Sequence, residues 1–94
     1  MTESRDSAET IALQALAWLA VQEDLLSVFM GATGAGAQDL REGAQDPAFQ
    51  GAVLDFLLMD DDWVRAFSAD CALAPERVAA ARAALPGGEQ VHWT

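Results

Sequence analysis

The stretch FQGAVLDFLLMDDDWVRAF, residues 49–67, joins an almost wholly apolar segment to three consecutive aspartates and then to a second helix-like segment. Carboxylates in the first turn of a helix satisfy free backbone N–H groups and complement the helix dipole. We therefore interpret Asp60 as the N-cap of a helix that runs to about Cys71, with Asp61 and Asp62 in its first turn. Successive helical side chains diverge by about 100°, so at most two of the three carboxylates could face one metal ion. A metal-binding or enzymatic role at Asp60–Asp62 is the weaker alternative.

The composition of the 94 residues favours helix over strand. Alanine is the commonest residue, valine and threonine are sparse, and the hydrophobic fraction is 52% with only three prolines. Such a chain has ample apolar surface to offset the entropy of ordering, and its local preference is helical. We expect a single all-α domain over 1–94, folded as a compact bundle of five to six short helices.

Cap and turn signals divide the chain into these helices. Asp6, with Glu9 three residues later, resembles a capping box and is expected to start a helix that ends near Val21. Asp46 is the expected N-cap of the helix whose first residue is Pro47. The remaining expected helices are 22–30, broken by Gly31, Gly34 and Gly36 with Gly34 left-handed, then 38–44, and 74–85.

The sequence also resembles itself at an offset of 38 residues. The apolar stretch IALQALAWLAV, residues 11–21, falls on FQGAVLDFLLM, residues 49–59, and Glu23 falls on Asp61. A true repeat would make two three-helix units, 8–45 and 46–84, followed by a tail at 89–94. Both apolar stretches lack a polar face, so each should be a central helix.

Apolar surface that six short helices cannot cover would form an interface with a protein partner or a second copy of the chain. The residues that we consider for such contact are the large aromatic ones on or beside these helices and in the tail. They are Trp18, Phe56, Trp63 and Trp93.

The charge balance excludes several classes of partner. Fifteen acidic residues stand against five arginines and no lysine, for a formal charge of −10. Nucleic acids and anionic membranes bind proteins through Lys and Arg and repel an acidic surface, so we expect neither as a partner.

The sequence also indicates where the protein resides. The N-terminus is acidic, whereas a signal peptide begins with basic residues, and the longest apolar run is too short to span a membrane. The single cysteine cannot form an internal disulfide, which fits a reducing compartment. We expect a soluble, cytoplasmic protein.

The residue inventory offers little for catalysis. His92 is the only histidine and Cys71 the only cysteine, so neither a catalytic triad nor a zinc site can be assembled. Cys71 is expected to be a buried structural thiol. GATGAGAQDL, residues 31–40, lacks the lysine of a phosphate loop and the third glycine of a dinucleotide fingerprint. We predict no enzymatic activity, no cofactor, and no catalytic or metal-binding residue.

The chain resembles a known family over most of its length. The similarity lies in AWLA, LLSVF, TGAGAQDLREGAQDPAF, VLDFLLMDD, VRAF and APERVAAARAALPGG, and extends from about residue 8 to Trp93. These motifs resemble an uncharacterised alphaproteobacterial family catalogued as domain of unknown function 3572. The resemblance implies an α-helical, bacterial, cytoplasmic protein and carries no activity.

Two functional hypotheses follow from the sequence. The first is a small protein-interaction or adaptor module that uses an apolar face near helices 11–21 and 49–59. The second is an acidic decoy or regulator that binds a basic protein by charge.

Overall fold

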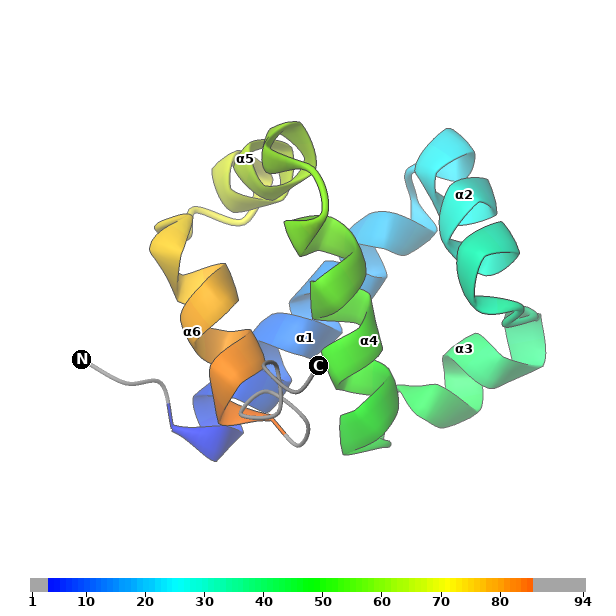
Figure 1. Ribbon diagram of the computed structural model, residues 1–94, viewed down its shortest axis with the longest axis horizontal. Coiled ribbons are helices and arrows are strands. Elements are labelled where there is room, and N and C mark those ends of the chain that lie inside the picture. Colours follow the sequence, from blue (N-terminus) through cyan, green and yellow to red (C-terminus); the bar gives the residue numbers. More distant parts are fainter. Residues whose placement is uncertain (1–3, 86–94) are drawn as a thin grey trace, which may run out of the picture.

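The computed structural model describes residues 4–85, which form an all-α bundle without strands in that range (Figure 1). The expected fold class is therefore confirmed. The helices are α1 (Arg5–Ala20), α2 (Glu23–Thr33), α3 (Ala37–Gly43), α4 (Pro47–Leu58), α5 (Asp61–Asp70) and α6 (Glu76–Ala84).

The starts of the helices follow their capping residues. Asp46 and Asp60 occupy the N-cap positions predicted for them, and their Oδ1 atoms accept from the backbone N–H groups of Ala48 at 3.0 Å and Asp62 at 2.9 Å. The prediction for Asp6 is wrong. Ser4 is the N-cap of α1, and its hydroxyl oxygen accepts from the Ser7 N–H at 3.0 Å, which places Asp6 within the first turn.

The end of α2 also differs from expectation. The helix continues through Gly31 to Thr33, because an isolated glycine weakens a helix without ending it. Gly34 then takes the left-handed conformation, with φ of 76°, and its N–H donates to the Met30 carbonyl at 2.8 Å. That is the C-terminal geometry glycine favours because it has no Cβ.

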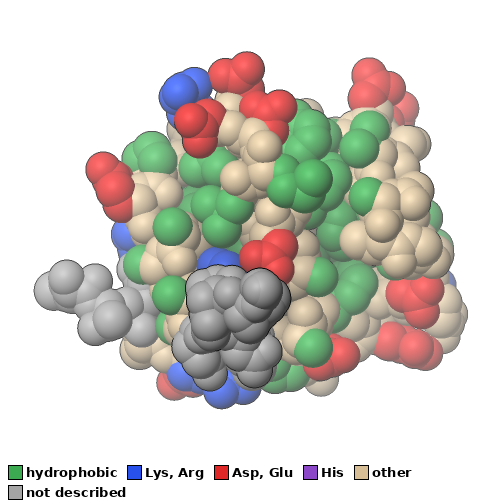
Figure 2. All heavy atoms as spheres, viewed as in Figure 1, with side chains coloured by type: hydrophobic (Ala, Val, Ile, Leu, Met, Phe, Trp, Pro, Cys, Tyr) green, Lys and Arg blue, Asp and Glu red, His purple; other side chains and the backbone are tan. Residues whose placement is uncertain are grey.

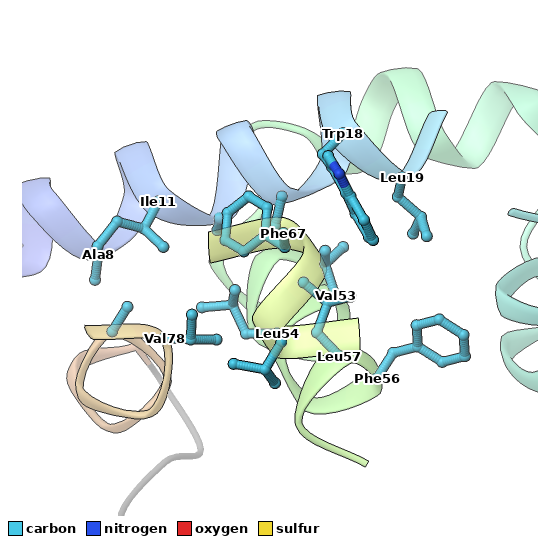
Figure 3. Packing of buried hydrophobic residues seen from close by; sticks show 14 of the residues in the cluster. Ala8, Ile11, Trp18, Leu19, Val53, Leu54, Phe56, Leu57, Phe67 and Val78 are labelled. Carbon is cyan, nitrogen blue, oxygen red and sulfur yellow. The ribbon is translucent and has the colours of Figure 1, made fainter. Parts of the chain in front are cut away.

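The core lies around α4, which packs against α1, α5 and α6 and more lightly against α3. In the close-up, α1 crosses above α4, with Phe67 of α5 and Val78 of α6 filling the space beside them (Figure 3). The central position predicted for the apolar stretch 49–59 is thus realised. The largest fully buried side chains are Phe29, Phe67, Ile11, Leu19, Leu54, Leu57, Leu85, Val53 and Val78.

Specific polar contacts join the helices within residues 4–85. Trp18 Nε1 donates to Asp70 Oδ2 at 2.7 Å, which joins the end of α1 to the end of α5. Arg82 of α6 pairs with Asp55 of α4 at 2.6 Å, and its guanidinium lies over Gly51, where a Cβ would come within 2.7 Å of it. Gly51 therefore leaves room for the Arg82 guanidinium against the surface of α4.

The 38-residue repeat stays a prediction. Glu23 and Asp61, which begin α2 and α5, are 38 positions apart, and Phe29 and Phe67 at the same offset are both fully buried. The packing of α2 on α1 is also matched by the packing of α5 on α4. These features are compatible with two related units.

No single helix among residues 4–85 combines the length and apolar character needed to cross a membrane. The pair α1 and α2 together has enough length and apolar character, but the two helices are bent by 114° relative to each other.

Candidate interaction groove

The structure separates the four aromatic residues considered for contact with a partner. Trp18 and Phe56 are 8% and 4% exposed and belong to the core, so neither is available at the surface. Trp63, on the first turn of α5, is only half-buried. Trp93 lies outside the described residues. Of the three aromatic residues of this set that lie within residues 4–85, Trp63 alone is placed where a partner could touch it.

Trp63 is part of an apolar groove between α2 and α5. The hollow has a volume of about 660 Å³ and is lined by Val21, Gln22, Glu23, Asp24, Leu25, Val28 and Trp63. Val21 is 72% and Val28 is 50% exposed, so the hollow presents two branched apolar side chains to solvent. Figure 2 shows hydrophobic side chains exposed between α5 and α2, with acidic side chains on both sides.

The tryptophan in this groove is held by a series of aromatic contacts. Trp63 stacks on Phe56 with ring centroids 4.7 Å apart and planes inclined by 21°. Phe56 meets Phe29 edge-on at 5.2 Å, and Phe29 meets Phe49 edge-on at 5.9 Å. Because Phe29 is fully buried and Phe56 almost so, the inner face of Trp63 rests on the core, and a partner would meet a fixed ring.

The local chain path explains why Val21 is exposed. Val21 is the C-cap of α1, and its N–H donates back to the Trp18 carbonyl at 3.2 Å. Only Gln22 separates it from α2, and the sharp bend between the two helices turns the chain away from the core. Met59, the C-cap of α4, lies at the equivalent turn before α5 and is 74% exposed.

The acidic residues beside the groove differ in how they are compensated. Arg65 pairs with Asp62 at 3.1 Å and approaches Asp61 at 3.9 Å, both on α5. Within residues 4–85, neither Glu23 nor Asp24 has a basic partner. Both stand exposed in the first turn of α2, where the helix dipole favours them but leaves their oxygens facing water. The groove thus has one rim of uncompensated negative charge.

A second hollow of about 530 Å³ lies where α2, α3 and α4 meet, and its polar groups are engaged. Asp39 accepts from the Gly36 N–H at 2.8 Å, Asp46 caps α4, and Glu42 accepts from Gln38 at 2.7 Å. These carboxylates hold the ends of α3 and α4. We therefore assign this hollow to the helix connections and not to a ligand.

The aspartate triplet is used by the fold in the same way. Asp60 caps α5, while Asp61 and Asp62 face Arg65. Within residues 4–85, no three His, Cys, Asp or Glu side chains converge as a set of metal ligands.

Cys71 lies at the C-cap of α5 and is half-buried. A buried thiol was expected from the sequence, so the structure corrects that prediction. Burial raises the pKa of its thiol above the ordinary value, and the neighbouring Asp70 carboxylate adds to this shift. A raised thiol pKa lowers the fraction of reactive thiolate at neutral pH. His92 lies outside the described residues.

Sequence reasoning missed the apolar lining of the groove. The first helix was expected to end near Val21 and the second to span 22–30, but no exposed apolar face was assigned to either. Val28 stands three positions after Leu25, so it widens the apolar face that carries Leu25. This excess width was the one signal available in the sequence.

Comparison with known proteins identifies a family and nothing more specific. A family model described as "Protein of unknown function (DUF3572)" matches residues 5–88. No curated protein and no solved structure matches the chain.

Proposed function

Because the chain belongs to this family of proteins of unknown function, which brings no activity with it, we propose a function from the geometry: a small protein-interaction module. Its binding surface is the groove lined by Val21, Leu25, Val28 and Trp63. The groove differs from the face expected at 11–21 and 49–59, since the apolar side chains of α4 are mostly used to build the core.

One observation carries the proposal: branched apolar side chains stay exposed around an aromatic ring that the core holds in place. Covering such a groove with a partner favours binding by about 25 cal/mol per Å² of apolar surface removed from water. Rigid aromatic side chains in concave apolar surroundings are the residues that most often dominate binding.

The other parts of the proposal rest on composition. The −10 charge supports a protein partner over a nucleic acid or an anionic membrane. The single cysteine supports a reducing, cytoplasmic and, by resemblance to the family, bacterial setting. We assign no catalytic step, because the aspartate carboxylates that looked most like chemistry serve as a cap and as ion-pair partners.

Site-specific photo-crosslinking in native lysate tests this function. A photoreactive residue at Val28 is expected to capture a defined protein, whereas the same residue at Leu13, which is 43% exposed on α1 and away from the groove, should not. Both positions are apolar and helical, so the pair is matched for stability. Equal capture at the two positions, or none at Val28, would reject the groove as the binding surface.

A further inference from the structure

Resting on the proposed function, we infer that the occupant of the groove is a basic amphipathic segment of another protein. Its apolar side chains enter between α2 and α5, and an Arg or Lys beside them pairs with Glu23 and Asp24. The apolar lining and the unpaired carboxylates lie within one hollow, which is the observation behind this inference.

The apolar half of this recognition follows from the lining. Val21 and Val28 are the exposed apolar residues of the hollow, and Trp63 supplies a ring fixed against Phe56. A partner that offered only charge would leave these surfaces in water and gain nothing from them. The occupant must therefore present apolar side chains to the groove.

The charged half of the recognition follows from the acidic residues beside the apolar lining. No Arg or Lys lines the hollow, and Glu23 and Asp24 lack a basic partner among residues 4–85. By contrast, the carboxylates of Asp55 and Asp62 already face Arg82 and Arg65. A cation on the occupant would thus find its complement at the start of α2, and the overall −10 charge would steer it there.

The same charges argue against a second copy of this chain as the occupant. A symmetric dimer uses the same patch on both copies, so the carboxylates of Glu23 and Asp24 would enter one interface with those of the other copy. Like charges brought together in an interface are unfavourable. A second copy would also bring no cation in its own hollow, because none of the residues lining it is basic.

Peptide binding to the full-length protein tests the inference. The probe is an 18-residue helical peptide of leucine and lysine with leucines on one face, compared with peptides in which glutamine or glutamate replaces every lysine. We expect the lysine peptide to bind tightest, measured by calorimetry, and its affinity to fall as NaCl rises.

Variants then assign the binding to its two parts. Val28→Asn should weaken binding of the lysine peptide about tenfold, as expected for losing one buried apolar side chain, while Leu13→Asn leaves it unchanged. The double variant Glu23→Gln with Asp24→Asn should weaken it severalfold and flatten its salt dependence. Circular dichroism of each variant checks that the fold is retained.

The outcomes separate this inference from the proposed function. If the glutamine peptide binds as tightly as the lysine peptide, or if the double variant has no effect, the basic occupant is wrong, although sensitivity to Val28→Asn would still support docking in the groove. If Val28→Asn leaves the affinity unchanged, the peptide binds by charge alone, as an acidic decoy would bind it, and the inference fails. Absence of binding by all three peptides also overturns the inference. The proposed function is then tested independently by the crosslinking experiment at Val28 and Leu13.

Discussion

Trp18 and Trp63 show how two tryptophans with similar sequence surroundings acquire different roles. Each lies on a helix among apolar neighbours, and periodicity alone predicts a core position for both. Trp18 is buried edge-on against Phe67, and its Nε1 reaches Asp70. Trp63 buries one face on Phe56 and presents the other side to the groove. The difference arises from how α5 crosses its neighbours, which no local pattern encodes.

The hydrogen bond from Trp18 to Asp70 is expected to contribute about 1 to 2 kcal/mol to stability, since its acceptor is charged and its donor is nearly buried. Asp70→Ala should therefore lower the free energy of unfolding in urea by roughly that amount. In a Trp18→Phe background, where the donor is gone, the same substitution should cost only a few tenths of a kcal/mol. Additive effects of the two substitutions would show that the two side chains are not coupled.

At the scale of helices, the sequence was most informative where a residue type has a single structural use. Asp46 before Pro47, and Asp60 before two more aspartates, mark N-caps because an Asx side chain can accept from the N–H groups of the first turn. The prediction for Asp6 failed because Ser4, two residues earlier, offers a competing cap, and the earlier start lengthens α1.

Gly31 and Gly34 illustrate the same difficulty at the end of α2, since glycine both weakens a helix and ends one. The prediction that Gly34 is left-handed is confirmed, but the sequence alone could not show that the helix tolerates Gly31 and continues to Thr33. The structure assigns termination to Gly34, with φ of 76°.

The two glycines give a matched pair of substitutions with opposite expected signs. Gly31→Ala should raise the free energy of unfolding by about 0.5 to 1 kcal/mol, because Gly31 is helical and no atom outside its own helix lies within 4 Å of an added Cβ. Gly34→Ala should lower it by about 1 kcal/mol, because a Cβ is disfavoured in the left-handed conformation. Thermal and urea unfolding measure both. Effects of the same sign would mean that α2 ends at a different glycine.

At the scale of the whole molecule, the fold class and the central place of α4 were predictable, because apolar character on every side of a helix requires neighbours on every side. The groove was not predictable. Its walls come from α2 and α5, whose separation is set by how both helices pack on α1 and α4. The sequence indicated that apolar surface would be left over, and only the assembled bundle locates it.

The packing also predicts how the two proposed units depend on each other. Within the described residues α1 packs chiefly on α4 and α6, so its buried side chains Ala8, Ile11 and Ala15 are covered largely by helices that follow residue 45. A fragment of residues 1–45 should therefore be largely unfolded, with weak helical circular dichroism and no cooperative thermal transition, since helices of this length are marginal alone.

Residues 46–94 retain the contacts of α4 with α5 and α6 but lose the cover that α1 provides. We expect this fragment to bind a hydrophobic dye and to melt broadly, and an equimolar mixture of the two fragments to recover helicity and a cooperative transition. A cooperative transition in either fragment alone would instead make the two units independent domains. In that case the groove between α2 and α5 would lie between domains, and its width would vary with their relative motion.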